Sequence, residues 1–394
     1  MAQQDHPHAT PETVPPGEAG EIEELATLTT KLQDARAKND ASQNGRVLRG
    51  VHPKSHGCVE AEFAVREDID KKYRVGLFAH PGKTYSAWIR FSNASVLREH
   101  DLKGGQNGSR GMAIKVLGVK GKMLERDNGQ KNQDFLMINT PQFAFANVRD
   151  YLRLERILER DPLGADPKPY FIPAVLAQLG QPKDGEPAEI SAKRQFLQSI
   201  VTKDPLLNKL TPADLMGTIA SAKVAAKIAA LPVRNPMQVQ YFGAAPFLFG
   251  PGQVMKFSAA PVAPKAQAPF DPNAVTPGNP PENYLAEALT WSMSGTEAIK
   301  YDFMIQTRSF DDEGLNIEDA TTTWPDEEAN YVPVARITIR APQSPNSRAV
   351  RDHCERLAFS PWHGLADHKP LGGINRMRQQ VYSSSAEHRG AGGT

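Results

Sequence analysis

The order in which hydrophobic patterns follow one another along this 394-residue chain limits its fold more than any other feature. Alternating apolar and polar residues, typical of strands, occupy residues 46–139. Helical patterns follow over 147–232, and strand-like segments resume between 237 and 341. This order favours an α+β fold on an antiparallel sheet, most simply one continuous barrel, because a doubly wound parallel sheet would alternate strand and helix throughout.

The same patterns predict individual elements. We expect strands at 57–65, 85–92, 111–119, 237–244, 254–261, 287–293, 299–310 and 334–341. We expect helices at 21–40, 148–161, 191–204, 213–232 and 372–390. Residues 1–20 are polar and rich in Pro, Glu and His, which predicts a disordered arm before a single domain over 21–394, with a helical insert at about 147–232.

Composition excludes several classes of protein. The chain has 46 Lys and Arg against 45 Asp and Glu, so it lacks the basic excess of a dedicated nucleic-acid binder. It has no apolar run long enough to span a membrane and no secretory signal at its start. Its two cysteines, Cys58 and Cys354, cannot form a disulfide framework, so a reducing cytoplasm is the expected location. A homo-oligomer is an option that the sequence leaves open.

Familiar catalytic motifs are absent, among them the P-loop, the dinucleotide fingerprint, CxxC, HExxH and GxSxG. Two histidine pairs have metal-like spacing: His52 with His56, and His363 with His368. Pro53 interrupts the first pair, and spacing alone often matches by chance. We therefore do not predict a zinc site from these pairs.

Tyr382 is the most informative single position. Arg378 precedes it by four residues in a segment with helical character, so both side chains would share one face. A guanidinium favours the ionised form of a neighbouring phenol, and a phenolate is a recognised ligand of haem iron. The alternative is an ordinary core tyrosine beside a surface arginine, since pairs at this spacing are common on helices.

His52 is a second candidate. It lies in RGVHPKSHG, and a histidine after such a segment is usually structural unless another group orients its ring. Ser92, in WIRFSNAS, offers a hydroxyl that could hold the Nδ1 side and fix the tautomer.

Taken together and in order, several segments resemble the haem catalase superfamily. LRGVHPKSHG resembles the distal-histidine segment, WIRFS the VRFS strand, and SRGMAIKVL the RGFAVKF strand. QDFLMINTPQFAF resembles the NNTPIFF segment, YDFMIQTRSF and the stretch after it resemble the VWP region, and RMRQQVYSSSAEHR resembles the RxxxY proximal helix. Several motifs in the correct order form a specific signal, although each alone would be weak.

The resemblance implies a catalase-like antiparallel eight-stranded β-barrel with packed helices, no C-terminal flavodoxin-like domain, and haem, most simply haem b, between barrel and helices. It implies that Tyr382 is the proximal iron ligand, that Arg378 is its charge partner, and that His52 is the distal acid–base residue oriented by Ser92. Further residues implied at the haem are Arg49, Arg90 and Arg389 for the propionates, and Phe143 and Phe145 on the distal side. Ordinary salt bridges and core packing remain the alternatives for these five.

One departure concerns the distal amide. The family has two adjacent asparagines before its Thr-Pro, whereas this chain has Ile138-Asn139. Either Asn139 takes the distal role, or the distal side lacks an amide.

The implied function is haem-dependent decomposition of hydrogen peroxide or organic hydroperoxides, with a small peroxide as substrate. Two alternatives stay open. One is an isomerase of fatty-acid hydroperoxides of the allene oxide synthase type, which the apolar Ile138 would suit. The other is a haem-binding protein without catalysis.

Overall fold

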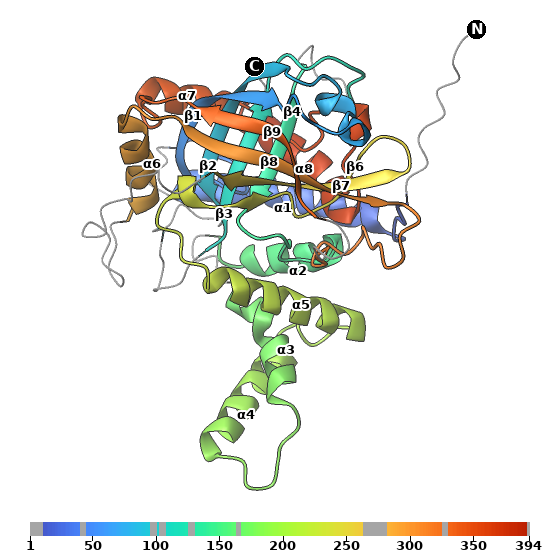
Figure 1. The fold of residues 1–394 in the computed structure, drawn as a ribbon. Coiled ribbons are helices and arrows are strands. Elements are labelled where there is room, and N and C mark those ends of the chain that lie inside the picture. Colours follow the sequence, from blue (N-terminus) through green and yellow to red (C-terminus); the bar gives the residue numbers. More distant parts are fainter. Residues whose placement is uncertain are drawn as a thin grey trace.

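In the part of the chain that the structure describes, nine strands form one antiparallel sheet that closes into a barrel (Figure 1). This computed structural model describes residues 11–39, 45–94, 101, 108–124, 131–162, 167–262, 282–324 and 330–391. The strands are β1 (Ser55–Val65), β2 (Thr84–Asn93), β3 (Arg110–Val116), β4 (Gln133–Ile138), β5 (Tyr241–Phe242), β6 (Phe247–Leu248), β7 (Gln253–Pro261), β8 (Ile299–Ser309) and β9 (Val332–Ile339).

Closure comes from a pairing between strands distant along the sheet. The order is β5-β4-β3-β2-β1-β9-β8-β7-β6, and β5 also pairs with β7 through Tyr241 opposite Ala259. This pairing leaves an eight-stranded ring with β6 attached to β7. The predicted α+β fold with an eight-stranded antiparallel barrel is confirmed.

The barrel interior is a packed core. Successive side chains of a strand point to opposite faces, so every second residue enters the barrel. On β1 these residues are Val59, Ala61, Phe63 and Val65, all buried in one hydrophobic cluster. Inside it the Phe63 and Phe303 rings lie 5.2 Å apart, edge to face. A ligand site therefore has to lie on the outer face of the barrel.

Most predicted strands are found, but the one predicted at 287–293 is wrong. That segment belongs to helix α6 (Tyr284–Ser294). The buried residues of this helix recur at helical spacing and begin before the predicted window: Tyr284, Leu285, Ala288, Leu289 and Met293. A seven-residue window starting at Glu287 was too short to show this period.

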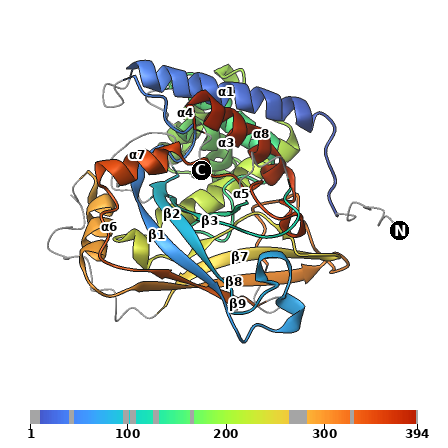
Figure 2. The ribbon, with the colours of Figure 1, turned by 90° about the horizontal axis from the view of Figure 1, so that it is seen from above.

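Helices α1 (Glu18–Asn39), α2 (Val148–Leu158) and α8 (Gly373–His388) pack together beside the barrel, with α1 along α8 (Figure 2). Helix α7 (Arg348–Arg356) lies against β1, as does α6. The helices predicted at 21–40, 148–161, 191–204, 213–232 and 372–390 are all present. The short α7, the strand β4 and a separate helix at 168–179 were not predicted. No helix among the described residues has the length and apolarity needed to cross a membrane.

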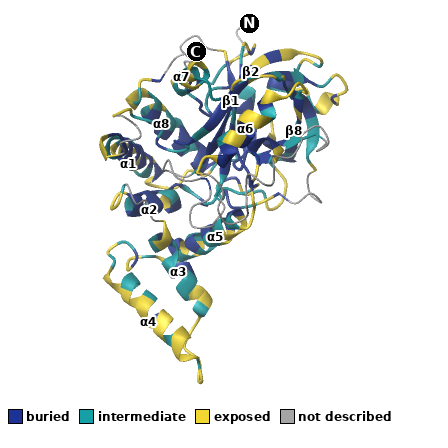
Figure 3. Cartoon of the chain, turned by 90° about the vertical axis from the view of Figure 1, so that its left-hand side faces the viewer, coloured by how far each residue is buried: buried dark blue, intermediate teal, exposed yellow. Residues whose placement is uncertain are grey.

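The predicted helical insert projects away from the barrel. Beyond α2 it contains α3 (Lys168–Leu179), α4 (Ala188–Lys203) and α5 (Pro212–Ala229). Helix α4 lies farthest from the barrel and is largely exposed, with only Arg194 buried (Figures 1 and 3). The sheet resumes after the insert at β5, so the insert interrupts the barrel without entering it.

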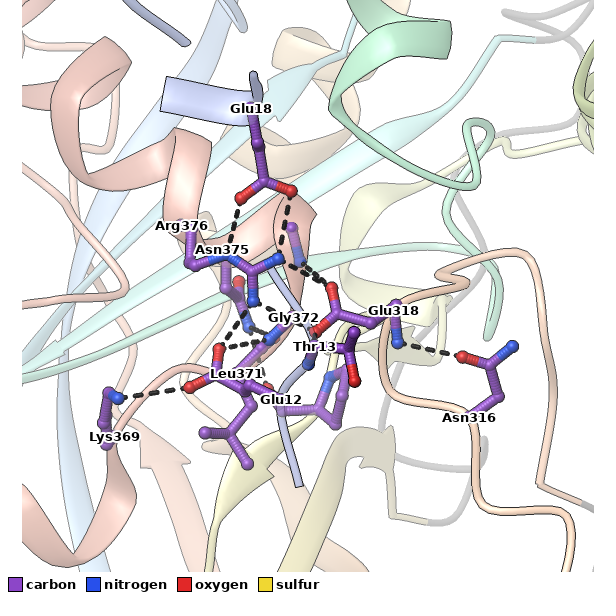
Figure 4. A network of polar contacts seen from close by, with 12 residues as sticks. Glu12, Thr13, Glu18, Asn316, Glu318, Lys369, Leu371, Gly372, Asn375 and Arg376 are labelled. Carbon is purple, nitrogen blue, oxygen red and sulfur yellow. Dashed lines mark hydrogen bonds and ion pairs between the residues drawn. The ribbon is translucent and has the colours of Figure 1, made fainter. Parts of the chain in front are cut away.

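The N-terminal segment is anchored to the start of α8 by a network around Arg376 (Figure 4). The guanidinium donates to Glu18 at 2.6 and 3.0 Å, to Glu12 at 2.8 Å, and to Glu318 at 2.7 and 3.1 Å. Glu12 also accepts from the backbone N–H of Gly372 at 3.0 Å. The predicted disordered arm is therefore wrong for residues 11–20, which are held by this network and by α1. Residues 1–10 lie outside the described part.

Replacing Arg376 with Gln should destabilise the protein by about 3–5 kcal/mol, because three carboxylates would lose their shared cation, two of them on largely buried side chains. Urea unfolding followed by circular dichroism measures this. Arg348→Gln is the matched control, since Arg348 is 92% exposed and lies 3.8 Å from Asp352. It should change stability by less than about 0.5 kcal/mol. Equal effects of the two substitutions would contradict the assignment.

Candidate active site

A cavity spanning about 690 Å³, part of which is open to solvent, lies between the outer face of the barrel and α8. Alternation along the strands explains its lining: on β2, Ile89 and Phe91 enter the barrel core, whereas Arg90 and Ser92 face the cavity. Strands β2, β3 and β4, residues 49–52 before β1, one residue of α1 and helix α8 all contribute. The lining residues are Thr29, Arg49, Val51, His52, Arg90, Ser92, Gly111, Met112, Ala113, Leu136, Met137, Ile138, Phe359, Arg378, Val381, Tyr382, Ser385, Ala386 and Arg389.

Seven of the ten residues predicted for the site line this cavity. They come from three parts of the chain, namely the segment before β1, strand β2, and α8 with its C-cap: Arg49, His52, Arg90, Ser92, Arg378, Tyr382 and Arg389. The lining does not include Asn139, Phe143 or Phe145. The Oδ1 atom of Asn139 accepts from the backbone N–H of Arg110 at 2.8 Å, so this amide joins β4 to β3, while its neighbour Ile138 faces the cavity.

The two phenylalanines pack behind the cavity. The Phe143 ring centroid lies 5.6 Å from the guanidinium carbon of Arg378 and 6.0 Å from the Phe145 ring. Phe145 in turn packs edge to face on Tyr151 and Tyr170. Phe143 thus supports Arg378 from outside the lining, and Phe145 belongs to the hydrophobic cluster of the helical insert.

His52 is held in one orientation from several directions. Its φ of 55° lies in the left-handed region, which no other non-glycine residue of the described chain adopts. Its Nδ1 lies 2.9 Å from the hydroxyl oxygen of Ser92, and its carbonyl accepts from Nη2 of Arg90 at 2.9 Å. A Cβ on Gly111 would approach Nδ1 to 2.5 Å, so only glycine fits beside the ring. The Nε2 atom is left for a ligand.

The surroundings of His52 keep its ring neutral. Desolvation by the surrounding protein, followed by the positive charges of Arg90, Arg378 and Arg49, lowers the pKa of His52 to about 3. A neutral imidazole at physiological pH can accept a proton at Nε2 and then return it.

Tyr382 and Arg378 lie one turn apart on α8, on the side of the helix that faces the cavity. The guanidinium carbon of Arg378 is 5.8 Å from the Tyr382 ring centroid, and its Nη1 donates to Oδ1 of Asn375 at 3.3 Å. The predicted juxtaposition of phenol and guanidinium is therefore present. The chain thus lines the cavity with an imidazole from the segment before β1 and with a phenol from α8.

An arginine cluster lies at the rim of the cavity, formed by Arg49, Arg90 and Arg389 around Glu355. Arg49 pairs with the Glu355 carboxylate, and Arg90 lies 3.6 Å from it. Arg389 donates to the carbonyls of Glu355 and Leu357. Although burial raises the pKa of Glu355, the charges of Arg49, Arg90 and Arg389 outweigh it and give a net lowering.

The charge in this cluster is unbalanced, because three guanidinium groups face one carboxylate. Burial, with repulsion from Arg49, lowers the pKa of Arg90 to about 9, and it lowers the pKa of Arg389 to a similar value. The Nε atom of Arg90 is buried without a hydrogen-bond partner. These features suit a ligand that brings further carboxylate groups to the rim. Sequence reasoning missed Glu355, because its pairing with Arg49 spans 306 residues.

The histidine pairs do not converge on a metal site. His56 bonds Asn93 at 2.8 Å rather than facing His52, and Nδ1 of His363 lies 3.1 Å from Asp134. Nε2 of His368 accepts from the backbone N–H of Leu77 at 3.1 Å. Within the described ranges, no group of three or more His, Cys, Asp or Glu residues is arranged to hold a metal ion.

Comparison with known proteins gives partial sequence matches. No protein-family model matches the chain. A "Catalase-like protein" of Staphylococcus aureus is 29% identical over 134 residues, which cover 33% of this chain and 27% of that protein. A "Catalase" of S. aureus strain USA300 is 28% identical over 134 residues, or 24% of its length. The chain therefore matches about a quarter of the length of these curated relatives.

Solved structures match over nearly the whole chain. A bacterial catalase superposes with a TM-score of 0.58 at 16% identity, covering 99% of this chain and 64% of that one. Catalase A from Saccharomyces cerevisiae gives 0.57 at 15% identity, covering 99% and 67%. At such identities the likeness shows a shared fold.

We expect His52 to remain unprotonated at pH 5 in protein without added ligand. Its NMR resonances, assigned by their loss in His52→Gln, should not titrate between pH 5 and 8. In denaturant, the same ring should titrate near 6.5.

Because only the unfolded chain then takes up this proton, His52 should lower the free energy of unfolding by up to about 1.4 kcal/mol per pH unit below 6.5. A folded-state midpoint between 6 and 7 would contradict the electrostatic account.

Proposed function

Since the chain is a catalase-like superfamily protein, we propose that it decomposes hydrogen peroxide or organic hydroperoxides with a haem bound in the cavity between the barrel and α8. One observation carries the proposal. A single cavity is lined by an oriented imidazole, by a phenol paired with a guanidinium, and by an arginine cluster at its rim.

The residues of the cavity fit a haem by their chemistry. Tyr382 would bind the iron, and Arg378 would favour its phenolate form. Arg49, Arg90 and Arg389 would bind the two propionates, and the unpartnered Nε of Arg90 is one donor available to them. When bound, the haem supplies the redox chemistry of peroxide cleavage, which these side chains cannot supply.

His52 moves the proton in this proposal. Its neutral Nε2 would accept the proton from one peroxide oxygen and return it to the other, which leaves as water or alcohol. Ser92 keeps Nδ1 engaged, and the missing side chain of Gly111 provides the space in which the ring lies against β3. The chain therefore contributes orientation, proton transfer and an apolar enclosure.

A second candidate function follows from the apolar lining around His52. Ile138, Leu136, Met112 and Val51 line the cavity, and Asn139, the amide expected there, is engaged between β3 and β4. A cavity wall without an amide offers no amide hydrogen bond to a second hydrogen peroxide molecule. Such a wall therefore favours the alkyl chain of an organic hydroperoxide. Isomerisation of a fatty-acid hydroperoxide, which needs no outside reductant, is therefore the alternative activity.

Peroxide turnover by haem-loaded protein tests both functions. We expect oxygen release from hydrogen peroxide or dye oxidation by it, and His52→Gln should lower the rate at least about 100-fold, because general acid–base catalysis contributes that much. His80→Gln is the matched control, since His80 is exposed and outside the cavity lining. It should leave the rate unchanged.

The same protein is then incubated with a fatty-acid hydroperoxide alone. Conversion without reductant, together with little oxygen release from hydrogen peroxide, would select the isomerase. A protein that binds haem but converts neither peroxide is a haem-binding protein without catalysis, and it would overturn the proposal. Equal losses in His52→Gln and His80→Gln would remove the proton-transfer role of His52.

A further inference from the structure

The two cysteines of the chain are joined in the structure. Cys58 lies on β1 and Cys354 on α7, 296 residues apart in sequence, and they form a disulfide with a Cα–Cα distance of 6.4 Å. That distance lies within the usual range for disulfides. Two cysteines alone cannot form a disulfide framework, and the sequence led us to expect a reducing cytoplasm. The disulfide therefore needs a functional explanation.

The disulfide is a principal attachment of α7 to the barrel. Of the nine residues in α7, only Cys354 is buried. Two further side chains of α7 contact the sheet: the His353 ring lies 4.6 Å from the Trp88 ring on β2, and the Glu355 carboxylate lies 3.6 Å from Arg90 on β2. A short helix gains most of its stability from packing, so the position of α7 should depend strongly on the bond at Cys354.

Helix α7 also carries part of the arginine cluster. Glu355 follows Cys354 directly and pairs with Arg49 and Arg90 at the cavity rim. Nη2 of Arg49 donates to the carbonyl of Cys354 at 2.9 Å, and Arg389 donates to the carbonyl of Glu355. A shift of α7 would therefore move the counter-charge of the cluster.

A second cavity has both cysteines in its lining, although Cys58 and Cys354 are themselves only 1% and 2% exposed. It spans about 2100 Å³, part of which is open solvent, and residues of α6 and α7 also line it. Three arginines and three acidic residues also line it: Arg46, Arg348, Arg351, Glu287, Asp352 and Glu355. A thiol or peroxide that enters this cavity meets both cysteines, and the thiolate is the form of a thiol that reacts with disulfides and peroxides.

We propose that Cys58 and Cys354 are a reversible redox site whose disulfide locks α7 onto β1 and holds Glu355 in the arginine cluster. Oxidation by a hydroperoxide ROOH forms the sulfur–sulfur bond, with both thiol protons leaving in ROH and water. Reduction by two molecules of a small thiol restores both cysteines and yields the disulfide of that thiol. The redox site does not depend on haem, whereas its control of the haem site rests on the proposed function.

Thiol counting tests the chemistry. Reduced protein should show two reactive thiols, lose both on addition of one equivalent of hydrogen peroxide, and regain both with glutathione. Mass spectrometry should find the intramolecular link between the peptides containing Cys58 and Cys354. Cysteines that stay reduced under peroxide, or a disulfide that glutathione leaves intact, would overturn the proposal.

Hydrogen exchange tests the lock without any haem. Reduction should speed amide exchange in residues 348–356 by about tenfold or more and leave α2 unchanged, because only α7 is tethered by the bond. Cys58→Ser and Cys354→Ser should reproduce the reduced state and make α7 insensitive to peroxide. The reduced wild-type protein supplies the same measurement if a variant fails to fold. Equal exchange of α7 in the reduced and oxidised protein would rule out the lock.

In haem-loaded protein, reduction should also speed haem transfer to an apomyoglobin scavenger several-fold. If reduction leaves the rate of haem transfer unchanged while thiol counting and hydrogen exchange give the expected results, only the proposed control of the haem site is overturned. If the protein binds no haem, the proposed function fails while the two haem-free experiments still decide the redox lock.

Discussion

The docking of α8 on the outer face of the barrel is the interaction on which the candidate site depends. The N-terminus of α8 is fixed through Arg376, which joins carboxylates from the N-terminal segment, α1 and the loop after β8. The rest of the helix packs along α1. This position makes one cavity of the imidazole before β1 and the phenol of Tyr382, although 330 residues separate them. Without the network, an amphipathic helix could rotate or slide, and the cavity would lose one wall.

The arginines around the cavity have two separate effects, one on the protonation of His52 and one on the binding of an anionic ligand. Around His52, desolvation and neighbouring arginines lower the pKa, so the imidazole stays neutral and its Nε2 lone pair remains available. At the rim, the three arginines Arg49, Arg90 and Arg389 exceed the single carboxylate of Glu355 and favour an anionic ligand. Arg90 takes part in both, since it holds the carbonyl of His52 and lies beside Glu355. The placement of an anion and the protonation of His52 are thus coupled through one side chain.

Local patterns predicted the long helices and seven of the eight strands of the barrel ring, with β4 missed, because alternation and helical periodicity depend on near neighbours. Resemblance supplied seven of the 19 residues that line the cavity. The sequence could not reveal the pairing of Arg49 with Glu355 or of Cys58 with Cys354, since each joins residues about 300 positions apart. Nor could it show that Asn139 is engaged between strands, because that depends on the register of β3 and β4. Helix α6 was misread because its apolar residues also fit a short strand.

The central claim is that Tyr382 binds the iron of a haem in this cavity. Absorption and electron paramagnetic resonance spectra of haem-loaded wild type, Tyr382→Phe and the control Tyr73→Phe test it most directly, since Tyr73 lies outside the cavity lining. The account predicts a high-spin ferric tyrosinate spectrum in the wild type and in Tyr73→Phe, and its loss in Tyr382→Phe. Identical spectra from all three proteins, or no haem bound by the wild type, would contradict it.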